Sequence, residues 1–482
     1  MSFLKKFEAE DKKKKTNKKI EAELPFFMTI VTLLATSGFG PYTIFIKIKD
    51  LELLPNTRLE SLKILKKIDI LGKDPLMVMA ETKEKGVSSF GEFLNGWVSA
   101  IQSGGDVVNY LTTKMNNGFE IYESQQKEIA ERVKTLVETY MTMQIVVLAV
   151  YIIITATSSG GVAGATTSSD SDPLIIVIVL PPVVSSLFLF IAHKLNRPKV
   201  EELPWQKILI FGIPGVMAAV AIMILDIIPD YALYILGITL VASTIWPAMQ
   251  FKSKYKFAID AENATSQIMR DVAEARKAGL GPEKCVVKAT SRNDFSSFNP
   301  VANGISNKLQ WGMSLDDIFQ FLKNETKDFQ ILINFKVLFE VISAGGGNVN
   351  TLNTLAKVSE KMRNIEHTKR EMLKPYVMVG FMLIAITGFT TLLVIESLTS
   401  LEAQLETNEE KRVLMEADAK DRFQLLGIAI LIQSWIAGLF LGKITTGSYS
   451  GGFLYSALLL VITIGAILVI ELKIFSVSAI FG

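Results

Sequence analysis

Seven stretches of this 482-residue chain are long and apolar enough to cross a membrane as helices. They lie at approximately residues 141–157, 174–192, 208–228, 231–249, 376–396, 423–442 and 453–471. Inside a bilayer, a helix satisfies its own backbone hydrogen-bonding groups, which an open irregular segment cannot do. The sequence therefore predicts an all-α, polytopic membrane protein with about seven transmembrane helices.

The charged residues lie mostly outside these stretches. Hydrophobic residues make up 49% of the chain and charged residues 20%, a mixture typical of soluble modules joined to membrane spans. We expect a basic, disordered head at 1–20, a helical bundle at 21–140, four spans at 141–249, a second bundle at 250–375, and three spans with an acidic outer loop (397–422) at 376–482.

Lysine and arginine are concentrated in the connections on one side of the predicted membrane. The connection 193–207 carries Lys194, Arg197, Lys199 and Lys207, whereas residues 158–173 contain no lysine or arginine. The positive-inside rule then places residues 1–140 and 250–375 in the cytoplasm and the C-terminus outside the cytoplasmic membrane.

The N-terminus resembles a signal peptide, with Lys12–Lys15, Lys18 and Lys19 preceding "LPFFMTIVTLLATSG". Glu21 and Glu23 intervene, and no small-residue cleavage site follows. We expect residues 22–37 to form a helix with an unusually apolar face. We expect that face to be buried within its own module. The alternatives are that it packs on the membrane spans or on a partner.

Two short patterns occur twice. Gly38-Phe39-Gly40-Pro41 matches Gly279-Leu280-Gly281-Pro282 at an offset of 241, and Gly104-Gly105-Asp106-Val107 matches Gly346-Gly347-Asn348-Val349 at an offset of 242. The second match also pairs Phe93 with Phe335 and Trp97 with Phe339. The repetition predicts two homologous helical bundles.

The residue types in these patterns are those of helix ends. Glycine closes a helix in the left-handed region, and proline suits the first turn of the next helix. Asp106 and Asn348 share the ability to cap a helix N-terminus, so we interpret both as caps and not as catalytic groups.

With "IQSGGDVVNYL" in the first module, and "GLGPEKCVVKA" and "ISAGGGNVNTLNTLA" in the second, the chain resembles the type II secretion F-domain family. The first module's "KDPLMVMAETKEKGVSSFGEFLNGWVSAIQSGGDVVNYL" resembles the archaeal branch most closely. That family contains the platform proteins of type II secretion, type IV pili and the archaellum. The resemblance implies an assembly platform for a type IV pilus-like filament, which couples a cytoplasmic hexameric secretion ATPase to pilin or archaellin subunits. It also makes a homodimer plausible and implies no chemistry of the platform's own.

Basic residues outside the spans are the candidates for contact with the ATPase. They are Lys12, Lys13, Lys14, Lys15, Lys18, Lys19, Lys66, Lys67, Arg276 and Lys277. A solvated helix face, or attraction of the basic head to anionic membrane lipids, is the alternative for each.

Little in the sequence indicates enzymatic chemistry. One cysteine and two histidines exclude a cysteine-based or histidine-based metal centre of the usual kinds. No phosphate-binding loop of the form G-x-x-x-x-G-K-[ST] occurs, and "GLFLGKIT" (438–445) has the wrong spacing. We expect no enzyme, no cofactor, no metal and no nucleic-acid partner. The alternative function is a membrane transporter or another membrane scaffold without a filament role.

Overall fold

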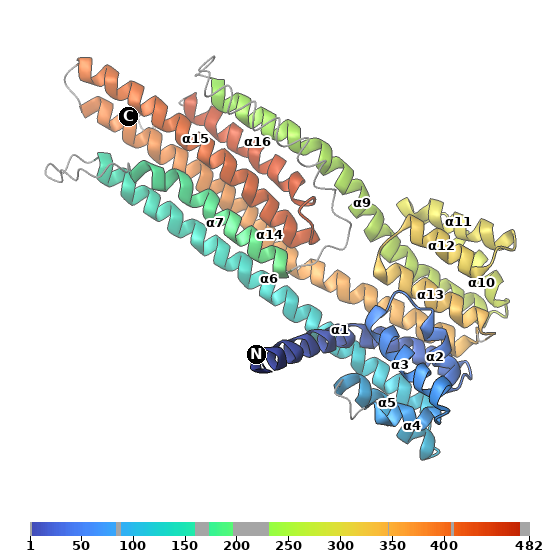
Figure 1. Cartoon of the computed structure of the whole chain (residues 1–482). Coiled ribbons are helices and arrows are strands. Elements are labelled where there is room, and N and C mark those ends of the chain that lie inside the picture. Colours follow the sequence, from blue (N-terminus) through green and yellow to red (C-terminus); the bar gives the residue numbers. More distant parts are fainter. Residues whose placement is uncertain are drawn as a thin grey trace. The chain divides into compact units, whose positions relative to one another are not determined.

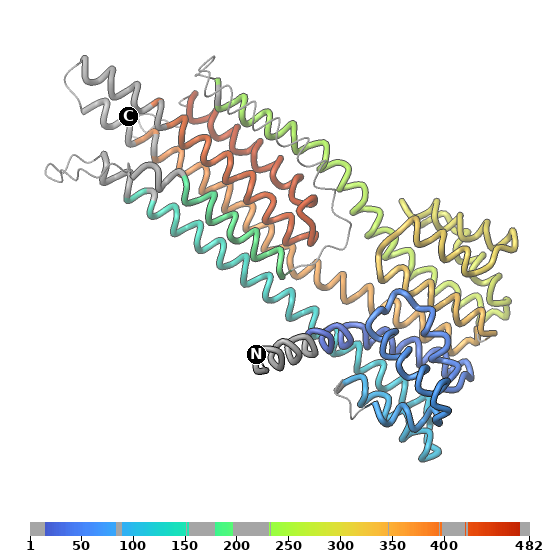
Figure 2. Tube along the Cα trace, in the orientation of Figure 1, coloured from blue at the N-terminus to red at the C-terminus, as the bar shows by residue number. Residues whose placement is uncertain are grey.

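The computed structural model describes the backbone of residues 2–82, 88–159, 173–195, 231–345, 347–405 and 409–472 (Figure 1). Figure 2 traces the chain from blue at the N-terminus to red at the C-terminus. Over these ranges the chain is helical and contains no strand. The all-α prediction is confirmed.

The chain divides into two compact units. The first comprises Met1–Lys127 and Lys256–Thr368, and the second comprises Glu128–Tyr255 and Lys369–Gly482. The predicted boundaries at 140, 250 and 375 each lie inside a continuous helix: α6 (Val107–Ser159), α9 (Ala232–Lys277) and α14 (Val349–Leu405). Hydropathy changes along these helices while the helix continues, so no linker marks the boundary, although Pro247 in α9 and Pro375 in α14 each remove one backbone hydrogen bond near it. Both predicted bundles fall within one unit instead of two.

The first unit consists of two sets of helices, labelled in Figure 1. The first helix set contains α1 (Ser2–Thr36), α2 (Pro41–Lys49), α3 (Pro55–Leu71), α4 (Pro75–Glu81), α5 (Ser88–Gln102) and the start of α6. The second helix set contains the end of α9, then α10 (Pro282–Thr290), η3 (Ser296–Phe298), α11 (Asn299–Gln310), α12 (Leu315–Glu325), α13 (Phe329–Ser343) and the start of α14.

Helix bounds in the two sets recur at one spacing. Helices α2 and α10 begin at Pro41 and Pro282, which are 241 residues apart. Helices α5 (88–102) and α13 (329–343) begin and end at that same spacing. Helix α3 starts at residue 55, and its counterpart, η3 followed by α11, starts at residue 296.

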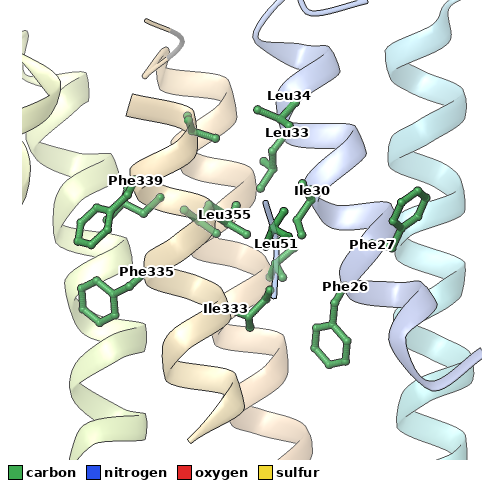
Figure 3. Packing of buried hydrophobic residues seen from close by; sticks show 14 of the residues in the cluster. Phe26, Phe27, Ile30, Leu33, Leu34, Leu51, Ile333, Phe335, Phe339 and Leu355 are labelled. Atoms are coloured by element: carbon green, nitrogen blue, oxygen red, sulfur yellow. The ribbon is translucent and has the colours of Figure 1, made fainter. Parts of the chain in front are cut away.

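A single apolar core joins the two sets. Its buried side chains come from α1 to α6 in the first set and from α9 to α14 in the second. In Figure 3, Ile30 and Leu33 of α1 lie on the side toward Leu355 of α14, while Phe27 lies toward α6. The stretch 22–37 is thus a helix buried within the first unit, where its side chains pack against helices of both sets.

The second unit contains α7 (Pro173–Leu195), α15 (Glu409–Thr446), α16 (Gly452–Glu471) and the remaining parts of α6, α9 and α14. Among the described residues, five helices are long and apolar enough to span a membrane, namely α6, α9, α14, α15 and α16. Helix α7, whose side chains the structure describes from Val179 to Leu195, is apolar over that range, and the predicted span 208–228 lies outside the described residues. By helix length and composition, the chain is a multi-pass membrane protein.

The head that we expected to be disordered is helical. Helix α1 begins at Ser2, so the expected disordered head at 1–20 extends a buried helix. Lysine, glutamate and alanine are good helix formers, and elongation costs much less than nucleation. The acidic segment 397–422 has the spacing of a helix, with Leu401, Leu405, Val413 and Leu414 among charged residues. It is mostly helix in the structure, since α14 continues to Leu405 and α15 starts at Glu409.

Candidate functional site

The joint between α1 and α2 has the same geometry as the joint between α9 and α10. Gly38 and Gly279 have φ angles of +91° and +85°. The N–H of Phe39 donates to the carbonyl of Leu34 (3.2 Å), and that of Leu280 donates to the carbonyl of Ala275 (3.3 Å). Both joints therefore end the preceding helix in a Schellman motif, where only glycine takes the left-handed position without strain.

The helices that follow these joints also begin in the same way. Gly40 and Gly281 are the N-cap residues, and Pro41 and Pro282 occupy the first turn. The carbonyl of Gly40 accepts from the N–H of Ile44 at 3.1 Å, and that of Gly281 accepts from Cys285 at 2.9 Å. Helix termination and helix initiation thus account for both glycines and the proline of the Gly-x-Gly-Pro pattern.

At the second joint, Asp106 and Asn348 both cap the following helix. The Oδ1 of Asp106 accepts from the N–H of Asn109 (2.9 Å), and the Oδ1 of Asn348 accepts from the N–H of Thr351 (2.7 Å). Each side chain accepts a hydrogen bond from a backbone N–H that has no partner within its helix. Helix capping therefore accounts for Asp106 and Asn348 without a catalytic role.

The glycines of the second joint correct the predicted register. Gly104 has φ of +65°, and the glycine with the matching geometry is Gly345, with φ of +72°. Gly346 lies outside the described residues. Helices α5 and α13 therefore align at 241, which pairs Trp97 with Leu338 and not with Phe339. The caps align at 242, so the second set has one extra residue in this turn.

The sequence comparison did not identify a third pair of joints. Gly72 closes α3 with φ of +61°, and Gly312 follows α11 with φ of +76°. Each stands two residues before an N-cap, Asp74 or Ser314, whose side chain accepts from the next helix's N–H groups. The signal was present: glycine, any residue, then a capping residue also describes Gly38-Phe39-Gly40 and Gly104-Gly105-Asp106.

The predicted ATPase-contact residues differ in their exposure. Lys15, Lys18 and Lys19 on α1 and Lys66 on α3 are exposed. The side chains of Lys12, Lys13 and Lys14 are outside the described part of the structure. Lys67 is half-buried and lies 3.4 Å from Glu81, which also binds Lys73 at 2.6 Å. The hydrogen bond from Lys73 is the main cause that holds the pKa of Glu81 below its usual range.

Arg276 has a structural role that the sequence did not suggest. Its Nε donates to the carbonyl of Gly347 at 2.6 Å, and its Nη1 donates to the carbonyl of Leu280 at 2.9 Å. It therefore ties the two joints of the second set together. Lys277, the next residue, is exposed.

Polar contacts accompany the apolar core where the two sets meet. Lys323 of α12 binds Glu52 at 2.7 Å, and Lys47 of α2 lies 3.4 Å from Glu340 of α13. The Nδ2 of Asn348 makes a long hydrogen bond, 3.4 Å, to the carbonyl of Thr36. The hydrogen bond from Lys323 lowers the pKa of Glu52.

Tyr122 of α6 lies beside the second set, near Gln330 and Glu366. Burial raises the pKa of its hydroxyl, and the negative charge of Glu366 raises it further. The hydroxyl of Tyr122 therefore stays protonated at neutral pH.

The second unit contains a buried chain of neutral polar groups. The Oγ of Ser185 lies 3.1 Å from the hydroxyl of Tyr140 and accepts from Gln144 at 3.3 Å. The Nε2 of Gln433 donates to the Oε1 of Gln144 at 2.6 Å. These contacts join α6, α7 and α15.

The segment "GLFLGKIT" is a helix-packing motif. A Cβ on Gly438 would stand 2.3 Å from the Cα of Ser456, and one on Gly442 would stand 2.0 Å from the Cα of Gly452. Small residues four apart let α15 approach the backbone of α16, as in other membrane helix pairs. Lys443 is buried, and its Nζ lies 4.4 Å from the ring centroid of Tyr449.

No group of three or more histidine, cysteine or acidic side chains with metal-binding geometry occurs among the described residues. The single thiol, Cys285, is buried, and burial raises its pKa. No family model, no curated protein and no solved structure matches the chain.

Proposed function

We propose that this chain is a cytoplasmic-membrane platform for assembling an archaeal type IV pilus-like filament, either an archaellum or an adhesive pilus. In this role it couples a hexameric secretion ATPase in the cytoplasm to the insertion or motion of pilin or archaellin subunits. The proposal combines the family resemblance of the sequence with the arrangement of helices in the two units.

The proposal treats the two helix sets as homologous cytoplasmic modules. It is supported by the pairs of left-handed glycines, 38 and 279, 72 and 312, and 104 and 345, which punctuate the same order of helices. We further propose seven spans, the third at 208–228, with the C-terminus outside. Four spans between the modules return the chain to the same side of the membrane, in agreement with the lysine and arginine distribution.

The observation that carries the mechanism is the continuity of α6, α9 and α14. Each helix begins in one compact unit and ends in the other without interruption. A displacement imposed on the first unit would be passed along these three helices to the apolar helices, with Pro247 of α9 and Pro375 of α14 as the positions where a helix can bend. The shared core supports movement of the two helix sets together, because separating them would expose Ile30, Leu33 and their partners to water.

The exposed basic residues Lys18, Lys19 and Lys66 are available to a partner, whereas Arg276 is not. An acidic surface of the ATPase or anionic membrane lipids would both attract the basic start of α1. A homodimer would bring two such surfaces to one assembly.

Solute transport is the competing function, and the polar chain through Ser185, Gln144 and Gln433 is the observation that favours it. Intramembrane polar groups commonly mark a transport path. Against it, these three groups satisfy one another and carry no charge.

Reconstitution with the secretion ATPase tests the proposal. The full-length protein in lipid nanodiscs is expected to bind the hexamer and to change its rate of ATP hydrolysis. A chain lacking residues 1–19 serves as the comparison for the basic head. Failure of the intact protein to bind or affect the ATPase, combined with uptake of a solute into proteoliposomes, would favour the transporter.

A further inference from the structure

An open, charged groove runs between α9 and α14 in the first unit. Its volume is about 160 Å³, and six charged residues line it: Arg270, Glu274 and Lys277 on α9, with Lys357, Glu360 and Arg363 on α14. On each helix they recur at spacings of three or four residues, so they share one helix face.

The groove has an excess of positive charge. Four cations face two carboxylates, a net of two positive charges. Among the described residues, Arg270, Lys277 and Lys357 form no ion pair within 4.0 Å. Their side chains are also exposed, so they remain available for a ligand.

The corresponding seam of the first helix set is closed. There, α1 and α6 stand where α9 and α14 stand in the second set. The Oγ1 of Thr32 donates to the carbonyl of Leu111 at 3.2 Å, and a Cβ on Gly118 would lie 3.1 Å from the Sδ of Met28. The two helices are thus in direct contact at this seam.

The closed seam is also covered by a helix of the second set. Phe329, the first residue of α13, places its ring 4.9 Å from that of Phe26 on α1. The counterpart of Phe26, 241 residues later, is Gln267, which lines the open groove. The face that receives a helix in the first set is open in the second. There the apolar residues Leu33, Met115 and Ile121 are replaced by Glu274, Lys357 and Arg363.

We propose that the α9–α14 groove receives an acidic helix of a partner protein. A helix fits because one covers the equivalent face of the first set. Acidic side chains fit because three unpaired cations line the groove. The identity of the partner as the secretion ATPase rests on the proposed function, whereas the groove's preference for acidic helices does not.

Charge removal in the groove tests the preference directly. The triple variant R270Q/K277Q/K357Q changes only exposed side chains, and K114Q/K284Q/K288Q removes the same charge from exposed sites outside the groove. The probe is a fluorescent helical peptide with glutamate at every fourth position, and its glutamine analogue is the negative control. We measure binding to the full-length protein in nanodiscs by fluorescence anisotropy at low and high salt.

The intact protein and K114Q/K284Q/K288Q are expected to bind the glutamate peptide more weakly as salt rises. R270Q/K277Q/K357Q is expected to bind it at least about tenfold more weakly than both. Equal binding by the two triple variants, or no binding by the intact protein, overturns the groove as an acidic-helix site and leaves a solvated face.

Co-purification with the ATPase separates the two proposals. Loss of ATPase binding in R270Q/K277Q/K357Q alone supports the groove as the docking site. ATPase binding that is equal in both variants overturns that assignment while the platform function stands. If the intact protein binds no ATPase, the platform function fails, and the peptide measurement alone decides whether the groove binds acidic helices.

Discussion

The ring of Phe26 meets the ring of Phe329 edge-on, with centroids 4.9 Å apart and an interplanar angle of 85°. Phe26 lies on α1 of the first helix set, and Phe329 begins α13 of the second. This contact explains why residues 22–37 are so apolar. Helix α1 buries one face against its own set and another against the second set, whereas the matching part of α9 leaves its second face in solvent.

Replacing Phe26 by alanine removes this contact and leaves a cavity. The free energy of unfolding is expected to fall by about 3 kcal/mol, because truncation of a buried aromatic side chain loses both burial and packing. Thermal unfolding of the detergent-solubilised chain, followed by far-UV circular dichroism, measures the change. The matched control is Gln267→Ala at the counterpart position, where we expect little effect. Equal loss in the two variants would show that Phe26 does not hold the sets together.

Gly279→Ala is expected to destabilise the chain by roughly 1–2 kcal/mol. Its φ of +85° is strained for any residue with a Cβ, although open space surrounds it. Gly281→Ala in the same joint is the control, because its φ is −61° and its surroundings are also open. The prediction fails if Gly279→Ala is tolerated as well as Gly281→Ala in the same thermal measurement.

Arg276→Ala is expected to lower stability by about 2 kcal/mol, since two charge-assisted hydrogen bonds to backbone carbonyls are lost. The neighbouring Lys277→Ala should leave the unfolding midpoint almost unchanged because that side chain is exposed. If Arg276→Ala instead weakened ATPase binding without altering stability, Arg276 would be a contact residue and not a tie between joints.

Gly442→Ala is expected to separate α15 from α16 and to cost about 1–3 kcal/mol, because its Cβ would collide with the backbone at Gly452. Gly465→Ala on α16 is the control, since nothing lies within 4 Å of the added Cβ. Heat-induced aggregation in detergent, measured by the soluble fraction after heating, should rise only for Gly442→Ala. Indistinguishable curves for the two variants would rule out close packing at this site.

The pair formed by Glu52 and Lys323 should make a small, pH-dependent contribution to stability. The hydrogen bond from Lys323 lowers the pKa of Glu52, so the contribution is present above the unfolded carboxyl pKa and is lost as pH falls through the folded value. Glu52→Gln should therefore flatten the acid side of the unfolding midpoint plotted against pH. An unchanged profile would mean that solvent screens the pair completely.

Local features of the fold were predictable from the sequence. Glycine and proline at helix ends act through their own backbone geometry, so the joints at Gly38 and Gly279 could be placed without the structure. Five of the seven predicted spans coincide with helices long and apolar enough to cross a membrane, since this property depends on composition within a short window.

Long-range features were not predictable. The pattern of residues 22–37 indicated burial, but only the packing of Phe26 on Phe329 shows that two helix sets share the buried faces. The second set has three glycines (345–347) where the first has two (104–105), and the sequence does not show which glycine is the extra one. Sequence comparison therefore paired Trp97 with Phe339, one residue away from its structural counterpart Leu338. Arg276 looked like an exposed charge because one of its carbonyl acceptors, that of Gly347, lies 71 residues further along the chain.

ATP hydrolysis by the secretion ATPase in the presence of the full-length protein tests the central claim most directly. The platform proposal predicts that the protein in nanodiscs binds the hexamer and stimulates hydrolysis several-fold, while empty nanodiscs do neither. An unchanged hydrolysis rate, with no complex detected at any protein concentration tested, would contradict the assignment of this chain as an assembly platform.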